Sequence, residues 1–170
     1  MNSIYKLSLL VFIVVSTSFK TSMKLTVTSP DFKDNGMIPS KFTCEGEQAS
    51  PALDVSGTPA SAKSLALIVH DPDAPLKGGF THWVMWNIAT DGKIAESFKG
   101  ADQGFNGAHK NGYMGMCPPS GIHHYHFKVY ALDTKLTVDK NTDKAGLEKA
   151  MTGHIVAEGE LIGLYQKAKK

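Results

Sequence analysis

An apolar run that ends in a proline-rich turn constrains the fold of this chain more than any other feature. Residues 64–70 are apolar on both faces, as in a central strand, and residues 71–75 then read Asp-Pro-Asp-Ala-Pro. A proline has no backbone N–H for a neighbouring strand and fixes φ, so the strand must stop there. We therefore expect the carboxylates of Asp71 and Asp73 at the end of a central strand, in a stiff turn.

The remaining pattern predicts a mainly β domain. Sixteen glycines and eight prolines in 170 residues fit a chain rich in turns. Further strands are expected over residues 24–28, 81–89, 123–132 and 155–165, with a short edge strand over residues 52–55. A short helix is expected over residues 143–152, with Thr142 as N-cap and Gly153 as its stop. Residues 93–111 are polar and glycine-rich, which predicts a long surface loop.

The period of two along a strand predicts which side chains share a face. In residues 123–132, His123 and Tyr125 continue the buried face, whereas His124 and His126 fall on the wetter face. Two further sets are expected to share a face: Asp71 with Leu65, Leu67 and Val69, and His82 with Val84, Trp86 and Ile88. The pattern predicts that histidines and aspartates meet where the central strands end.

The charged residues narrow the choice of partner. The formal charge is +2, too small to predict nucleic-acid binding, and all 18 basic residues are lysine. A chain without arginine has no bidentate fork for phosphate or carboxylate groups. Any anion site must therefore use lysine, histidine or backbone N–H groups.

The first 18 residues have the pattern of a secretory signal peptide. Lys6 precedes an apolar stretch over residues 7–15, and small residues follow at 16–18, which predicts cleavage before Phe19. The stretch is shorter than the ~20 residues that span a bilayer. A periplasmic or secreted protein is therefore expected. The alternative is translation from Met23, which would leave the protein in the cytoplasm.

The chain has two cysteines, Cys44 and Cys117, both in glycine- or proline-rich loop sequence. An even count in an exported protein predicts a disulfide, which over so long a loop stabilises by roughly 4 kcal/mol in the chain-entropy model. In a cytosolic protein, the alternative is two unpaired thiols.

His82 and His123 are candidate anion-binding residues. An imidazole can donate to a phosphate oxygen, and its unperturbed pKa of ~6.5 predicts tighter anion binding as the pH falls towards 6. Asp71 or Asp73 would orient an imidazole, and the glycine-rich residues 112–115 would add backbone N–H donors. The alternative is that both histidines only satisfy hydrogen bonds at the edge of the core.

Metal and hydrolase chemistry have weaker support. His124 and His126 share a strand face without a third ligand at convincing spacing, so an exposed pair is the preferred interpretation. No Gly-x-Ser-x-Gly nucleophile elbow is present, although Asp71, Asp73 and His82 would suffice for acid–base chemistry. No metal, cofactor or catalytic residue is predicted.

Two motifs resemble the signatures of the phosphatidylethanolamine-binding protein family, also called Raf-kinase-inhibitor-like proteins. The first is residues 71–75 followed by His82-Trp83, and the second is Gly-x-x-Pro-Pro-x-Gly-x-His-x-Tyr over residues 115–125. Ser50-Pro51 and residues 129–133 extend the match, which runs from about Leu25 to the C-terminus. The signal and the cysteines resemble exported members of the bacterial YbhB/YbcL-type branch. One departure is His124, which stands where many relatives have arginine.

The resemblance implies a single domain over residues 24–166: a β-sandwich with a large antiparallel or mixed sheet packed on a smaller one and one or two short helices. It also implies a small pocket for phosphate or a phospholipid headgroup. Carried over by position, that pocket consists of Asp71, Asp73, Pro75, His82, Gly115, Pro118, Pro119, His123 and Tyr125. Relatives in the bacterial branch can pair as dimers, so a homodimer is possible here.

The function expected is therefore non-enzymatic binding of a small anionic or phosphorylated ligand, with possible modulation of a partner protein. One alternative is a signalling or inhibitory protein that acts through surface loops such as residues 99–111. The other is a weak hydrolase that uses the Asp/His cluster.

Overall fold

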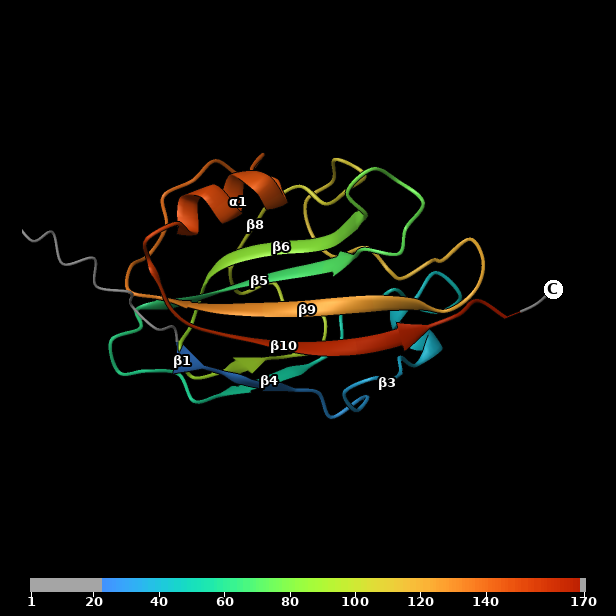
Figure 1. Cartoon of the computed structure of the whole chain (residues 1–170), viewed down its shortest axis with the longest axis horizontal. Helices are drawn as coiled ribbons and strands as arrows, with labels where there is room; N and C mark the ends of the chain where they lie inside the picture. Colours follow the sequence, from blue (N-terminus) through green and yellow to red (C-terminus); the bar gives the residue numbers. More distant parts are fainter. Residues whose placement is uncertain (1–22, 169–170) are drawn as a thin grey trace, which may run out of the picture.

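The computed structural model, which describes residues 23–168, is a β-sandwich with one short helix, as predicted (Figure 1). The large sheet has the strand order β1-β10-β9-β5-β6-β8, and β3 also pairs with β10. Its strands are β1 (Met23–Lys24), β3 (Gly36–Met37), β5 (Ser64–Asp71), β6 (Phe80–Ile88), β8 (Asp102–Gln103), β9 (His123–Leu132) and β10 (Ile155–Tyr165). The small sheet has the order β2-β4-β7, formed by β2 (Thr26–Thr28), β4 (Leu53–Ser56) and β7 (Lys93–Ile94).

Strand β5 is central, and its two faces serve two cores. Leu65, Leu67 and Val69 pack between the two sheets, while Ala66 and Ile68 pack beneath the helix. All five side chains are inaccessible to solvent. This double burial explains why the strand is apolar at every position rather than at alternate ones.

The face predicted for β6 is wrong, because two irregularities in its pairing with β5 change the alternation. Val84 and Trp86 face the helix, whereas Ile88 packs between the sheets. The β5–β6 register shifts next to Asn87, whose φ is +58°, and again at His82, which has no partner in the register. A bulge puts an extra residue on one strand and reverses the faces beyond it.

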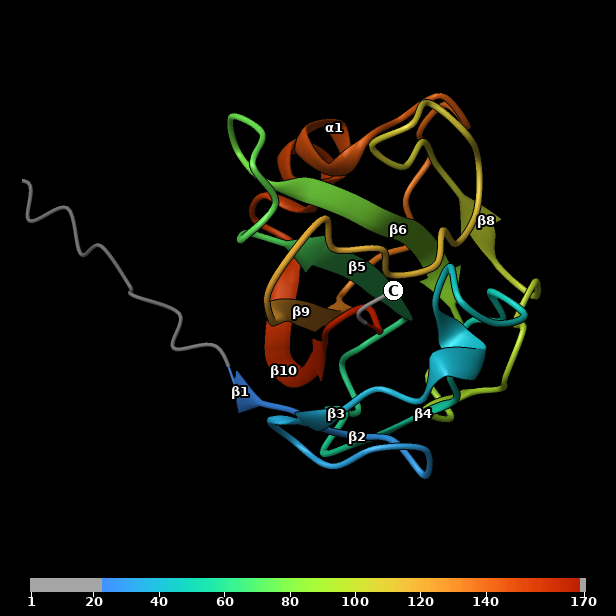
Figure 2. The same cartoon turned by 90° about the vertical axis from the view of Figure 1, so that its right-hand side faces the viewer.

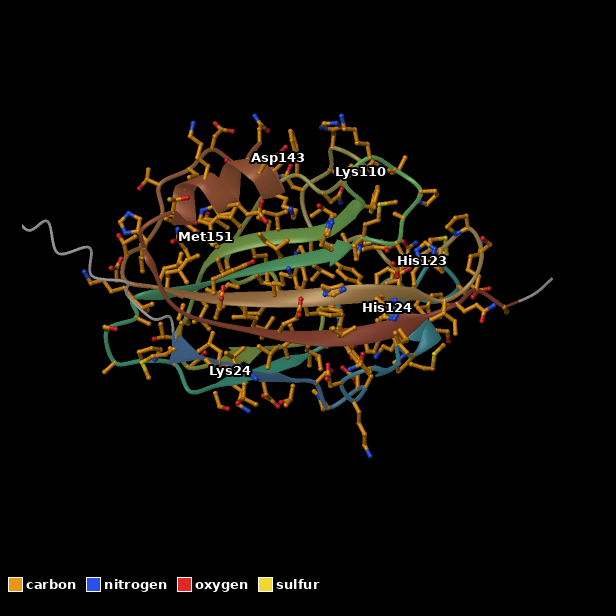
Figure 3. The ribbon with its side chains drawn as sticks, viewed as in Figure 1. Lys24, Lys110, His123, His124, Asp143 and Met151 are labelled. Atoms are coloured by element: carbon orange, nitrogen blue, oxygen red, sulfur yellow. A yellow bond between two sulfur atoms is a disulfide. The ribbon has the colours of Figure 1, made fainter. Side chains whose placement is uncertain are left out.

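Helix α1 (Lys144–Met151) begins one residue later than predicted. Its N-cap is Asp143 rather than Thr142, because the Asp143 carboxylate accepts the N–H of Gly146 at 2.9 Å. Leu147 and Met151 are buried against the large sheet, and Figure 3 labels Met151 where the helix ends, on its side towards the sheet. The helix thus covers one part of the outer face.

Two loop predictions need correction. Residues 93–111 include β7 and β8, so they are partly built into the edges of the two sheets. Strand β4 lies in the middle of the small sheet rather than at its edge, and it pairs with β2 and β7. Strands of two residues carry too little pattern to be read from sequence. A 3₁₀ turn, η1 (Ser40–Phe42), precedes β4.

The predicted disulfide is confirmed. Cys44 and Cys117 are bonded, with 5.4 Å between their Cα atoms, across 73 positions of sequence. The predicted signal peptide over residues 1–18 lies outside the described residues. Between residues 23 and 168, no helix is both long and apolar enough to span a bilayer.

Candidate ligand-binding site

The predicted site residues gather at one end of the large sheet. Strand β5 ends at Asp71, whereas its antiparallel neighbours β6 and β9 begin at Phe80 and His123. The end of one strand and the starts of two antiparallel neighbours lie at the same edge. Figure 2 faces this end, and Figure 3 shows His123 and His124 there.

Asp71 holds His123 in a fixed orientation. The Asp71 Oδ2 atom lies 2.8 Å from His123 Nδ1, and both side chains are buried. Asp71 Oδ1 accepts the backbone N–H groups of Asp73 at 2.9 Å and Ala74 at 3.1 Å. The turn that stops the strand therefore also fixes the carboxylate. Because a carboxylate only accepts, His123 donates from Nδ1 and turns Nε2 away from Asp71.

His82 is held in a similar way, but by an uncharged acceptor. Its Nδ1 lies 2.8 Å from the carbonyl oxygen of Met114, and its own carbonyl accepts the Met114 N–H at 2.9 Å. Burial lowers the pKa of His82, and the Met114 carbonyl opposes that shift only in part. The Met114 N–H is thus paired with β6 and is not one of the free donors expected from residues 112–115.

Tyr125 lies between the two imidazoles. Its ring meets His82 edge-on at a centroid distance of 5.3 Å and lies nearly parallel to His123 at 6.4 Å. The side chain is fully buried, and its hydroxyl has no hydrogen-bond partner among residues 23–168. Burial and the nearby Asp71 carboxylate raise the pKa of Tyr125, so the hydroxyl keeps its proton at neutral pH.

This geometry leaves one nitrogen, Nε2, available on each imidazole. With Nδ1 protonated, a neutral imidazole can only accept at Nε2. Protonation converts Nε2 into a donor and adds a positive charge, which is what an anion requires. His82 and His123 can therefore bind an anion as imidazolium ions, or an acidic O–H as neutral rings.

The other predicted residues are less uniformly placed. Gly115 and Pro118 are buried, whereas Pro75 and Pro119 are exposed in their turns. Asp73 does not orient a pocket histidine; it pairs with His124 instead.

The pair of Asp73 with His124 lies on the outside of the sheet. The Asp73 Oδ2 atom is 2.7 Å from His124 Nδ1 and accepts the His124 backbone N–H at 2.8 Å. These hydrogen bonds, and the His124 charge, lower the pKa of Asp73. Two acids of the same turn thus serve different histidines.

The disulfide anchors the loop that carries Met114. The Cys44 N–H donates to the Met116 carbonyl at 3.0 Å, and Thr43 forms a β-bridge with Met116. Gly115 lies so close to this segment that a Cβ atom would be 2.9 Å from the Thr43 carbonyl carbon. The glycine of the motif therefore permits close backbone packing.

Sequence reasoning missed two contributors. Met114 acts through its backbone, which no side-chain pattern reveals. Phe80 packs against His82 at 4.9 Å, and its position at the start of β6 is visible only once the strand order is known. In the part of the chain that is described, no group of three or more His, Cys, Asp or Glu side chains is placed to hold a metal ion.

Comparison with known proteins identifies relatives along most of the chain. The family model described as phosphatidylethanolamine-binding protein matches residues 28–166. A UPF0098 protein of Pyrococcus horikoshii is 46% identical over 156 residues, covering 85% of this chain and 78% of its own length. A UPF0098 protein of Methanothermobacter thermautotrophicus is 47% identical over 144 residues, covering 80% and 95%.

Two solved structures share the fold. A putative phosphatidylethanolamine-binding protein homologue from Chlamydia trachomatis, CT736, superposes with a TM-score of 0.82 at 40% identity, covering 86% of this chain and all of that one. The Escherichia coli protein YbcL, described as a member of the mammalian family, gives 0.79 at 34% identity, covering 85% and 99%.

Proposed function

This chain belongs to the phosphatidylethanolamine-binding protein family, and from that premise we propose that it binds a small anion or phosphorylated headgroup between His82 and His123. The observation that carries the proposal is the pair of buried imidazoles on either side of Tyr125, each held at Nδ1. Both Nε2 atoms are left for a ligand.

The buried Tyr125 hydroxyl supports a polar ligand. A buried hydroxyl without a partner costs about 1–3 kcal/mol. No partner is present among the described residues. A ligand oxygen that enters between the two imidazoles can pair with this hydroxyl, which offsets the cost. An apolar ligand would leave it unpaired.

The proposal includes coupling between anion binding and proton uptake by His82. Burial lowers the pKa of His82, so the ring is neutral in the free protein at neutral pH. A dianion favours the imidazolium form and raises that pKa on binding. Affinity should therefore rise as the pH falls, and the gain should end below the pKa of the free protein.

Titration of the mature protein with sulfate and with phosphoethanolamine, followed by NMR at pH 6 and pH 8, tests this proposal. The sulfate charge does not change between these pH values, so any pH dependence belongs to the protein. We expect shifts of the His82, His123 and Tyr125 resonances, larger at pH 6. If neither ligand perturbs these residues at pH 6, the anion-binding proposal is wrong.

His82→Asn is the informative variant and His126→Asn its control. The asparagine amide can still donate to the Met114 carbonyl, but it does not titrate. His126 lies on the outer face, where its Nδ1 pairs with Glu160 at 2.7 Å. Sulfate binding should weaken and lose its pH dependence in the first variant only. If the unmodified protein hydrolyses a generic phosphoester and His82→Asn does not, the protein is an enzyme rather than a binding protein.

A second candidate function is recognition of a partner protein at the rim of the pocket. Leu76, Met114 and Ile122 are large apolar side chains with exposed fractions of 59%, 36% and 52%. All three lie on segments that carry pocket residues. Replacing Leu76 and Ile122 by serine should abolish binding of such a partner while sulfate binding persists.

We also propose that the protein works outside the cytoplasm. The Cys44–Cys117 disulfide is the supporting observation, since such bonds persist in oxidising compartments. Fractionation of cells followed by intact-mass measurement tests this location and the cleavage before Phe19.

A further inference from the structure

A cavity lies beside β6 and β8, on residues other than the two histidines of the proposed anion site. Its volume is about 570 Å³, within the usual range for ligand sites. Its lining residues come from three loops and two strands: Glu47, Gln48, Ala49, Ser50, Trp83, Ser97, Phe98, Lys99, Gln103, Asn111, Gly112 and Tyr113. We call it the aromatic groove. Neither imidazole of the histidine pocket lines it.

Two aromatic side chains of this groove, Trp83 and Tyr113, are fixed by hydrogen bonds. Trp83 forms its buried floor, and the indole N–H donates to Gln103 Oε1 at 2.8 Å. The Tyr113 hydroxyl donates to the Phe42 carbonyl at 2.7 Å, and its ring meets Trp83 edge-on at 5.4 Å. Tyr113 is partly exposed, as is Phe98, a third aromatic residue of the lining. The groove therefore presents preformed ring surface to a ligand.

The polar groups of the aromatic groove are mostly uncharged. Trp83 occupies the Gln103 amide oxygen, so the amide NH₂ is left to donate. Gln48 adds a second amide. The hydroxyl of Ser50, another lining residue, is buried, with 3% of the residue exposed, and has no partner within residues 23–168. The charged residues of the lining, Glu47 and Lys99, have opposite signs.

Part of the wall is held in a strained backbone conformation. Gln48 and Ser97 have φ values of +57° and +55°, in the left-handed region that non-glycine residues rarely occupy. Such conformations cost about 1–3 kcal/mol and persist where the surrounding structure imposes them, commonly at ligand sites. The two residues lie on neighbouring loops of the groove, which are joined by a hydrogen bond from the Ser97 N–H to the Ser50 carbonyl at 3.0 Å.

We propose that the aromatic groove binds a neutral saccharide. Sugar rings have apolar C–H faces, which pack on aromatic rings such as those of Phe98 and Tyr113. Sugar hydroxyls both donate and accept, which matches amide side chains such as Gln48 and Gln103. The site would take one or two units of a neutral glycan.

Other ligand classes fit the groove less well. An anion would meet one lysine and one glutamate, whose charges cancel. A proline-rich peptide docks in aromatic-lined grooves, but here the Trp83 N–H is already bonded to Gln103 and is not available to a peptide carbonyl. The lining therefore favours an uncharged ligand with many hydroxyl groups.

An NMR titration with methyl glucoside, N-acetylglucosamine and maltose tests the proposal, with glycerol, phosphate and a proline-rich peptide as comparison ligands. We expect a sugar to shift the Trp83 indole and the Gln103 side-chain amide. Trp86, the other tryptophan of the chain, packs beneath α1 and serves as an internal control. The proposal is overturned if no sugar shifts these signals at millimolar concentration, if glycerol shifts them equally, or if only phosphate or a proline-rich peptide does so.

Variants locate the binding. Phe98→Ala should weaken sugar binding by about tenfold, the value of a typical aromatic contact. Tyr130→Ala, which removes a half-exposed ring from the outer face of β9, should leave it unchanged. If Phe98→Ala does not fold, the smaller substitution Ser50→Ala tests the same groove. Ser50→Ala should also weaken sugar binding. His82→Asn should abolish the pH dependence of sulfate binding without affecting sugar binding, so the two sites can fail independently.

Discussion

Replacing Asp71 by asparagine isolates the contribution of the buried carboxylate, because the shape of the side chain is kept. The Asp71 carboxylate accepts from His123 Nδ1 at 2.8 Å and from the backbone N–H groups of Asp73 and Ala74 at 2.9 and 3.1 Å. An asparagine oxygen can replace Oδ1 and keep both backbone bonds. Its NH₂ group then faces His123, whose Nδ1 must change from donor to acceptor.

The expected loss follows from these three hydrogen bonds. Hydrogen bonds to a charged group contribute about 1.5–3 kcal/mol each and neutral ones about 0.5–1.5 kcal/mol. If each of the three hydrogen bonds changes from charged to neutral and becomes weaker by about 1 kcal/mol, the total loss is roughly 3 kcal/mol. The neutral amide costs less to bury than a carboxylate, which offsets part of that loss. We expect Asp71→Asn to lower the free energy of unfolding by about 2 kcal/mol.

Asp73→Asn is the matched control in the same turn. Asp73 also pairs with a histidine, His124, but the two side chains are 41% and 50% exposed. Exposed pairs contribute about 0–1 kcal/mol. Hydrogen bonding lowers the pKa of Asp73, so its contribution is present above the unfolded value and disappears as the pH falls through the folded pKa.

Urea unfolding at pH 7.5 with the disulfide intact measures both free energies, and ¹⁵N shifts of the imidazoles report the tautomers. In Asp71→Asn, His123 should move its proton from Nδ1 to Nε2. Two results would refute the reasoning: Asp71→Asn costs no more than Asp73→Asn, or His123 Nδ1 stays protonated in the variant.

Three further predictions concern the same end of the sheet. Because burial lowers the pKa of His82, the unfolded chain binds a proton at this residue at a higher pH than the folded protein does. The urea midpoint should therefore decrease when the pH is lowered from 7.5 to 5.5, and it should decrease more in the unmodified protein than in His82→Asn. Gly115→Ala should cost about 1–3 kcal/mol in the same assay, because its Cβ would lie 2.9 Å from the Thr43 carbonyl carbon; an unchanged midpoint would contradict the close packing. Replacing Cys44 and Cys117 by alanine should lower the free energy of unfolding by about 4 kcal/mol, and a loss below 1 kcal/mol would mean that the unfolded chain is already compact.

The strands that could be predicted from sequence are the long ones whose pattern is uninterrupted. In β9, alternation correctly put His123 and Tyr125 inside and His124 outside. In β6, the same rule failed, because the bulges beside Asn87 and His82 shift the faces and no residue type announces them. Propensity and periodicity describe one strand, whereas a bulge is a property of a pair.

The candidate site was predictable where side chains carry the contact. The pairing of Asp71 with His123 follows from two residues at the ends of adjacent strands, once the strand order is fixed. The acceptor of His82 is a backbone carbonyl, which any residue at position 114 would supply. The aromatic groove was equally hidden, because its rings, Trp83, Phe98 and Tyr113, come from three separate segments of the chain.

The two acceptors give the two pocket histidines different electrostatic roles. A protonated His123 is balanced by the carboxylate of Asp71, so that pair adds no net charge to the pocket. A protonated His82 faces only the Met114 carbonyl, so its charge is not cancelled by its partner. Because the chain has no arginine, the two imidazoles and the Asp71 carboxylate together reach a net positive charge only when His82 is protonated. The pH dependence of anion affinity should therefore follow His82 and survive Asp71→Asn.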